Sequence, residues 1–516
     1  MMITSGMPLT RRQQMAVPSQ NSLLFEALLK TGLIPQRGAT PTFTRASPAT
    51  VTDFEGNART CLANEARFQG MRRVQNLVAY SENLANAIWV KSNVTPTYNV
   101  TDPVNGVTAL TITATGDAGE IYQTLTGRVI GTQHTGSWWI RRRTGSGVVK
   151  MYANTASSDI TSQISNTWQR ISVSSSATST TIYSGINIAT AGDSVDIWHP
   201  QLENVTNQSV QTPGDYVSTG VLSYPYQGAG VDGVQYFSTK LDGTAIIGGG
   251  YLNEPARTNL LLTSAVPATQ SITTTAQNYT VSFYGTGSCT LTGMASGTLN
   301  GTGVNNRVSL TVAATAGVVL ATFSGSTTNG QFENGPNMSS YIATTGSTAS
   351  RAADYLAYSI PNLPQKNFTI AAEIMKPQLS VTNSNGADAP IQIGGYSVNA
   401  SMTLGGYYLG LDTALGAWPT AWNLVSAASI SPYVAGVSTK SAWAFDNDGI
   451  TLRSAFSGAL VAARTANAAK TSNWVSNNIG IGSPPGGLND SDAMPFVISN
   501  VRLYNKALPD ATLRAL

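Results

Sequence analysis

The sequence predicts an all-β protein made of tandem β-sandwich (jelly-roll) modules, with one short helical segment near the N-terminus. Three observations lead to this fold class. Hydrophobic and polar residues alternate with a period of two over most of the chain. The alternating segments are short and recur about every ten residues. Turns rich in Gly, Asn, Asp and Ser separate them, and many short strands of this kind are typical of sandwiches.

The composition supports the same class and excludes several others. Only 11% of the 516 residues are charged, whereas 41% are hydrophobic, which is enough to build cores. A net charge of +3 without a clustered basic face argues against a nucleic-acid partner. The run from Arg141 to Arg143 is expected to be solvated charge at the end of a strand.

The cysteine and histidine content and the hydropathy pattern exclude further classes of protein. Cys61 and Cys289 are too few for a disulfide scaffold, and His134 and His199 offer no metal motif. No apolar run approaches the roughly 18 residues that span a membrane, so no membrane insertion is expected. The first residues lack the apolar stretch of a signal peptide, which predicts synthesis in a cytoplasm.

Residues 1–40 are predicted to form an N-terminal arm and a helix. The stretch SLLFEALLKTGLI (22–34) places leucines, among them Leu24 and Leu28, near an i, i+4 stripe. Ser22 can cap the start of this helix, and a glycine at its far end can stop it. A helix this short is marginal alone, so we expect it to dock on a partner. A helix packed within its own domain is the alternative.

Three β-sandwiches are predicted to follow. We place the first at residues 41–222, a second and shortened one at 223–360, and a third at 361–516. The segments with strand character are 106–114, 136–142, 168–176 and 194–203, then 278–285, 307–314 and 317–325, and finally 367–375, 449–456, 478–483 and 495–505.

The first two sandwiches are predicted to be copies of one unit. The opening segment QNLVAYSENL (75–84) aligns with TNLLLTSAVP (258–267), and the closing segments after residues 200 and 330 also align. The matched pairs are Asn76 with Asn259, Ser81 with Ser264, Gln201 with Gln331, Glu203 with Glu333, and Tyr216 with Tyr341. The opening and closing strands are expected to be neighbours, as in a jelly roll.

Several segments resemble the carbohydrate-binding-module-like sandwiches of bacteriophage virion proteins, which occur in tail fibres, tailspikes and head or collar fibres. These segments are TFTRASPATVTDFEGN (42–57), TWQRISVS (167–174), GGYLNEPARTNLL (249–261) and SYIATTGSTASRAAD (340–354). Residues 365–516 resemble a concanavalin A-like (laminin G-type) lectin domain. Its best mark is FVISNVRLYNKALPDATLRAL (496–516), where a last strand leads into a short helix.

This resemblance implies a structural and adhesive component of a phage particle rather than an enzyme. It implies a homotrimer that is made in the host bacterial cytoplasm and displayed on the virion. The N-terminus would bind other virion proteins, and the sandwiches would contact host cell-surface glycan. A collar, head or baseplate decoration fibre without glycan binding is the alternative. A tailspike-type polysaccharide depolymerase is the second alternative, although no pair of carboxylates marks itself as catalytic.

Five aromatic residues are candidates for glycan binding, because the face of a pyranose ring stacks on an aromatic platform. Two of them are adjacent in a predicted strand, so their side chains point to opposite faces and one belongs to the core. The candidates are Trp138, Trp139, Trp198, Tyr407 and Trp474.

The segment GGYLNEPARTNLL is interpreted as a junction between modules. Arg257 is expected to bind carbonyls or a carboxylate such as Glu254 or Glu333, and Asn259 is expected to hold a turn. Glu203 and Glu333 occupy the same place in both copies, which favours buried scaffold carboxylates. A calcium or sugar ligand is the alternative role for these two residues.

No cofactor is expected, and calcium is the one alternative left open. In AFDNDG (444–449), Asp446 and Asp448 offer oxygen ligands at a spacing that suits calcium. A tight turn before the following strand is the favoured interpretation of the same segment.

Overall fold

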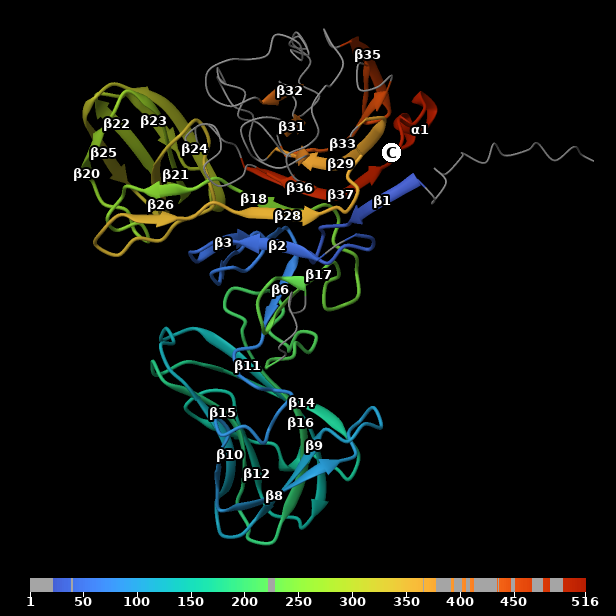
Figure 1. Ribbon diagram of the computed structural model, residues 1–516. Helices are drawn as coiled ribbons and strands as arrows, with labels where there is room; N and C mark the ends of the chain where they lie inside the picture. The colour runs from blue at the N-terminus through green and yellow to red at the C-terminus, as the bar shows by residue number, and fades with distance from the viewer. Residues whose placement is uncertain are drawn as a thin grey trace, which may run out of the picture.

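The structure is a computed structural model that describes residues 22–38, 40–220, 228–364, 366–376, 391–393, 401–404, 409–412, 434, 436–446, 451–465, 477–482 and 495–516. In these ranges the chain is nearly all β, which confirms the predicted fold class. Strands gather into three sandwiches, and a short helix, α1 (Asp510–Ala515), follows the last strand. Figure 1 shows two of the sandwiches projecting from the third.

The central sandwich has two sheets that enclose one core. The larger sheet has the order β35-β34-β33-β29-β37-β18-β5, and β1 also pairs with β37. Its strands are β1 (Leu23–Ala27), β5 (Phe68–Gln69), β18 (Gly250–Asn253), β29 (Phe368–Met375), β33 (Ser438–Asp446), β34 (Thr451–Phe456), β35 (Ala459–Thr465) and β37 (Phe496–Tyr504). The facing sheet has the order β2-β28-β36-β30-β31-β32. Its strands are β2 (Pro41–Thr44), β28 (Tyr355–Ser359), β30 (Ile391–Ile393), β31 (Ser401–Leu404), β32 (Leu409–Asp412) and β36 (Asn478–Ile481).

The predicted N-terminal helix is wrong, because Leu23–Ala27 is a strand that pairs antiparallel with β37. The side chains of Phe25 and Ala27 are buried in the central core, which is the alternation of a strand. Leu29, with φ of +53°, follows the end of the strand. The segment LLFEA fits either period when read alone, so tertiary pairing decides between the two.

The two leucines predicted to dock on a virion partner therefore have different environments. Leu24 packs against the central core, and Leu28 lies just after the strand with 39% of its surface exposed. The first 21 residues of the predicted arm lie outside the described residues.

The first inserted sandwich consists of two five-stranded sheets, with orders β14-β11-β16-β9-β8 and β13-β12-β15-β10-β7. The strands are β7 (Val90–Ser92), β8 (Val94–Val100), β9 (Ala109–Ala114), β10 (Gly119–Leu125), β11 (Gln133–Thr144), β12 (Val149–Tyr152), β13 (Ser157–Asp159), β14 (Gln169–Ser176), β15 (Ile182–Ile188) and β16 (Ser194–Asn204). The chain enters through β6 (Arg72–Gln75) and leaves through β17 (Val234–Phe237). These two strands pair with each other, so the sandwich hangs from a two-stranded ribbon.

The second inserted sandwich repeats this attachment. Its sheets have the orders β20-β25-β22-β23 and β24-β21-β26. The strands are β20 (Gln270–Thr274), β21 (Gln277–Gly285), β22 (Ser288–Gly293), β23 (Gly297–Asn300), β24 (Gly303–Ala314), β25 (Gly317–Ser324) and β26 (Thr327–Asn334). The ribbon that carries it consists of β19 (Arg257–Asn259) and β27 (Ala349–Arg351).

Strand pairing thus crosses each of the three predicted domain boundaries. β1 pairs with β37, and β2 pairs with β28, which in turn pairs with β36. The central sandwich is assembled from three separate stretches of chain, and the two other sandwiches are insertions between them. The hairpin of β3 (Ala49–Thr52) and β4 (Ala58–Cys61) belongs to the central part, and Figure 1 shows β3 between the two insertions.

Candidate functional site

The predicted repeat is visible in the hydrogen bonds of the first inserted sandwich. The side-chain amide of Asn76 donates from Nδ2 to the carbonyls of Pro200 and Val217 at 3.0 and 2.9 Å. Its Oδ1 accepts the backbone N–H groups of Val78 and Leu202. One buried side chain therefore ties the opening strand to both closing segments.

Asn259 makes the same four bonds in the second inserted sandwich. Its Nδ2 donates to the carbonyls of Gly330 and Ile342 at 3.0 and 2.8 Å. Its Oδ1 accepts the backbone N–H groups of Leu261 and Phe332. Asn259 was expected to hold a turn, and its bonds also reach backbone carbonyls 71 and 83 positions away in sequence.

The Gln-x-Glu pair closes each copy in the same way. Gln201 donates to Glu203, and Glu203 accepts the backbone N–H of Gly214 at 2.8 Å. Gln331 donates to Glu333, and Glu333 accepts the backbone N–H of Ser339 at 2.7 Å. Both glutamates are buried, and burial raises the pKa of Glu203 above the usual carboxyl range. These contacts place both carboxylates in the scaffold.

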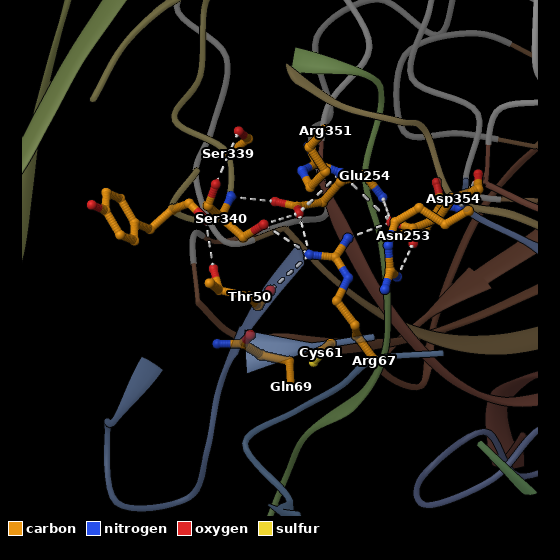
Figure 2. A network of polar contacts seen from close by, with 12 residues as sticks. Thr50, Cys61, Arg67, Gln69, Asn253, Glu254, Ser339, Ser340, Arg351 and Asp354 are labelled. Carbon is orange, nitrogen blue, oxygen red and sulfur yellow. Dashed lines mark hydrogen bonds and ion pairs between the residues drawn. The ribbon is translucent and has the colours of Figure 1, made fainter. Parts of the chain in front are cut away.

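A buried ionic cluster lies where the second insertion joins the central sandwich, and we call it the buried junction: Arg45, Arg67, Glu254, Arg351 and Asp354. Figure 2 shows Arg67 pointing at both Glu254 and Asp354. The Nη1 of Arg67 lies 2.7 Å from Glu254 Oε2, and Arg45 Nη1 lies 2.9 Å from Asp354 Oδ1. Arg351 Nη1 approaches Glu254 at 3.4 Å. Although burial favours the neutral acid, Arg351 and Arg67 lower the pKa of Glu254 to about 2.

Arg257 lies beside this cluster and contacts one of the two carboxylates expected for it. Its Nε lies 3.9 Å from Glu333 Oε2, and both side chains are buried. Glu254, the other expected partner, is occupied by Arg67 and Arg351. Sequence reasoning did not single out Arg45, Arg351 and Asp354. The signal was present, since all three stand in the segments that carry the family resemblance.

The aromatic candidates of the first insertion lie on different faces of their sheet, because neighbouring residues of a strand point to opposite sides. Trp138 is fully buried and packs edge-on against Trp89 at 5.4 Å between ring centroids. Its choice as a glycan platform is wrong, because the core encloses its ring. Trp139 is half-buried, and it faces the other side of β11.

Trp139 and Trp198 meet on this outer side, with ring centroids 6.3 Å apart. Trp198 also stacks on His199, and His199 stacks on Tyr216. Tyr216 donates to Glu82 at 2.8 Å. We call Trp139, Trp198, His199, Tyr216 and Glu82 the aromatic face. Its signal in the sequence was partial, because His199, Tyr216 and Glu82 were not chosen as glycan ligands.

Charged side chains continue this face along the same sheet. Asp196 is buried and accepts from Arg141 Nε at 2.7 Å and from Arg143 Nη1 at 3.1 Å. The guanidinium of Arg141 also lies over the ring of Trp168, 4.8 Å from its centroid. The arginine run is therefore partnered rather than simply solvated. Arg142 points the other way, toward Asp193 at 3.5 Å.

The remaining candidates fall mostly outside the described residues, which is the case for Tyr407, Trp474 and Asp448. Asp446 is described, and its Oδ2 accepts from Arg453 Nε at 2.8 Å. Within the described ranges, no group of three or more His, Cys, Asp or Glu side chains is arranged to hold a metal ion. No helix in these ranges has the length and apolar character needed to span a membrane.

Comparisons with known proteins give no family and only weak structural similarity. No family model matches the chain, and no curated protein matches it. The chain aligns with the binding domain of botulinum neurotoxin serotype D at 10% identity and a TM-score of 0.23, over 31% of this chain and 40% of that one. It also aligns with domain 4 of a GH43 extracellular arabinanase from Geobacillus stearothermophilus, in complex with arabinotriose. The identity is 13% and the TM-score 0.23, over 35% of this chain and 81% of that one. The alignment with the binding domain of Paraclostridial Mosquitocidal Protein 1 has 10% identity and a TM-score of 0.22, over 31% of this chain and 40% of that one. The chain therefore spans about 40% of the first two toxin domains, and no function is transferred from similarity at this level.

Proposed function

We propose that the chain is an adhesive structural component of a bacteriophage particle and that its aromatic face binds host surface glycan. The observation that carries the glycan-binding part is the meeting of Trp139 and Trp198 on the outer side of one sheet. The phage setting rests on the sequence resemblance described above. We further propose that the protein acts as a homotrimer displayed on the virion, with its N-terminal part bound to other virion proteins.

The chemistry of the face suits a sugar. A pyranose ring presents C–H groups that pack on an aromatic ring, and its hydroxyls need donors and acceptors nearby. Glu82, with 35% of its side chain exposed, supplies an acceptor, and Arg143, with 50% exposed, supplies a donor. Trp139 supplies a half-buried ring on the same side of the sheet. Each such site would bind weakly, and a trimer would gain strength from several contacts at once.

Trp139→Ala is expected to weaken binding to host surface polysaccharide by up to about tenfold, because an aromatic contact contributes about 0.5–1.5 kcal/mol. Binding would be measured by biolayer interferometry with the full chain, after light scattering has established its oligomeric mass. Tyr98→Ala is the matched control, since Tyr98 is an exposed aromatic residue of the same sandwich outside the aromatic face. Equal binding by the wild type and Trp139→Ala would contradict the proposal.

A second candidate function is a decoration fibre that binds no glycan. It is favoured by Trp198, which is only 8% exposed and already donates from Nε1 to Thr108 at 2.7 Å. A folded oligomer that binds neither host cells nor extracted polysaccharide would support this alternative. Shortening of the polysaccharide during the same assay would instead support a depolymerase.

A further inference from the structure

An open cavity of about 730 Å³ lies where the three sandwiches meet. Its floor is the β3–β4 hairpin of the central part, including Asn57 and Arg59. One wall comes from the first insertion, at Arg128 in the β10–β11 connection and at the end of β16. The other wall comes from β21, β24 and β26 of the second insertion, including Tyr284 and Asn305. This site shares no residue with the aromatic face.

Direct contacts tie the β3–β4 hairpin to both insertions. Arg59 Nη1 donates to the carbonyl of Thr206 at 2.8 Å, and Asn57 Nδ2 donates to the carbonyl of Asn207 at 2.9 Å. On the side of the second insertion, Thr50 Oγ1 of the same hairpin donates to the carbonyl of Tyr341 at 2.9 Å, outside the cavity lining. The cavity is therefore shaped in advance of any ligand, which lowers the cost of binding one.

The charge of the cavity is positive. Three arginines line it, and none of its lining residues is an aspartate or a glutamate. Arg59 and Arg73 are each neutralised by a carboxylate behind the lining, Asp53 at 2.6 Å and Glu65 at 2.7 Å. Arg128 forms no ion pair with any described residue, and its side chain donates from Nε to the carbonyl of Thr126 at 3.1 Å. Its guanidinium therefore supplies one uncompensated positive charge.

The other lining groups are those that recognise hydroxyls. Asparagine side chains stand on both walls, among them Asn204 on the first insertion and Asn305 and Asn329 on the second. Tyr284 adds a half-buried aromatic ring on the second wall. A volume of about 730 Å³ is within the range of sites that hold small-molecule ligands. An anionic and hydroxyl-rich ligand satisfies all of these features together.

We propose that this cavity binds a carboxylate-bearing sugar of an acidic surface polysaccharide. Arg128 pairs with the sugar carboxylate, Tyr284 packs on the ring, and Asn305 and Asn329 bind hydroxyls. The proposal rests on the proposed glycan binding and deepens it, because it assigns the class of glycan. It uses a different site, so the two claims can fail separately.

The test uses the full chain and isothermal titration calorimetry with defined oligosaccharides. The probes are an oligogalacturonate, a sialylated oligosaccharide, a neutral oligosaccharide of the same length, and inorganic phosphate. We expect at least one carboxylated probe to bind, and Arg128→Gln to weaken that binding by about tenfold or more, as loss of a charge-assisted pair predicts. Arg128→Lys should retain part of the binding, and Tyr284→Ala should weaken it.

The control variant is Arg514→Gln, an exposed arginine on α1 that does not line the cavity. Thermal unfolding of each variant would establish that it is folded. No binding of either carboxylated probe, equal binding of the neutral probe, or unchanged binding by Arg128→Gln would overturn the proposal. Phosphate binding with the same affinity would also overturn it, because the sugar ring would then contribute nothing.

A comparison with Trp139→Ala separates the two sites on natural polysaccharide. If Trp139→Ala abolishes binding and Arg128→Gln does not, the cavity proposal fails and the proposed function stands. If the reverse is found, the aromatic face is not the adhesive site and the cavity proposal is supported.

Discussion

Asp354→Ala is expected to destabilise the central sandwich by about 3–5 kcal/mol, because it leaves the buried guanidinium of Arg45 without a carboxylate and removes one of the two that pair with Arg67. Asp354 accepts from Arg45 and Arg67, and its Oδ2 also accepts the backbone N–H of Glu254 at 3.0 Å. The side chains of Arg45, Arg67 and Asp354 are fully buried, so water cannot replace the lost partner.

The two cysteines of the chain can report the unfolding of two different modules in this experiment. Its two cysteines are both buried, Cys61 in the central core and Cys289 in the core of the second insertion. Pulsed thiol labelling in increasing urea, read by mass spectrometry, therefore follows the two modules separately. Asp510→Ala removes an exposed ion pair with Arg453 and is the matched control, with an expected change within ~0.5 kcal/mol. If Cys61 is labelled at the same urea concentration in both variants, the buried junction does not stabilise the central sandwich.

Asn259→Ala is expected to destabilise the second insertion by at least ~3 kcal/mol. Four backbone groups lose their partner at a fully buried position, and each buried unsatisfied group costs about 1–3 kcal/mol. Labelling of Cys289 should move to lower urea, while labelling of Cys61 moves less. Asn306→Ala, at an exposed position of the same sandwich, should change neither. Unchanged protection of Cys289 in Asn259→Ala would show that the repeated asparagine is dispensable.

Acid should weaken the buried junction in a defined range of pH. The pKa of Glu254 is lowered to about 2 from its ordinary value of 4.5. Its ionised form therefore stabilises the fold fully above pH 4.5, and this contribution is lost as the pH falls toward 2. The loss is on the order of 3 kcal/mol. Urea midpoints of Cys61 labelling between pH 2 and 6, with a pyridyl disulfide that exchanges with thiols in acid and releases thiopyridone, would fall with acid in the wild type and vary less in Glu254→Gln. Parallel profiles for the two proteins would exclude Glu254 as the titrating group.

The sequence predicts the repeat well because its signal is local. Asn76 and Asn259 each stand at the end of a ribbon strand, are followed directly by Leu and five positions later by Ser, and both prove to make the same four bonds. The adjacency of Trp138 and Trp139 likewise predicts that only one of them belongs to the core, although it does not say which. These inferences need only the period of a strand or a short alignment.

The sequence does not predict the insertions or the strand at 23–27. Arg67 and Asp354 are 287 positions apart, and β1 pairs with a strand near the other end of the chain. Contacts between residues this far apart do not change the local pattern of hydrophobic residues. A division based on that pattern therefore places the domains one after another along the sequence and misses the insertions. The cavity is missed for the same reason, since its lining is gathered from residues between Gly56 and Asn329, which are 273 positions apart.

Each insertion begins and ends in a pair of neighbouring strands, so it can be exchanged as a unit. Gln75 lies opposite Val234, and Arg257 lies opposite Arg351, so the two ends of each insertion are neighbours in the central frame. A sandwich can therefore be shortened, enlarged or replaced while the frame keeps its pairing. The second copy is consistent with this freedom: only 72 positions separate Asn259 from Gln331, against 125 from Asn76 to Gln201, and the same closing bonds are kept. Binding specificity can change in such a frame by exchange of whole modules, without redesign of the body that holds them.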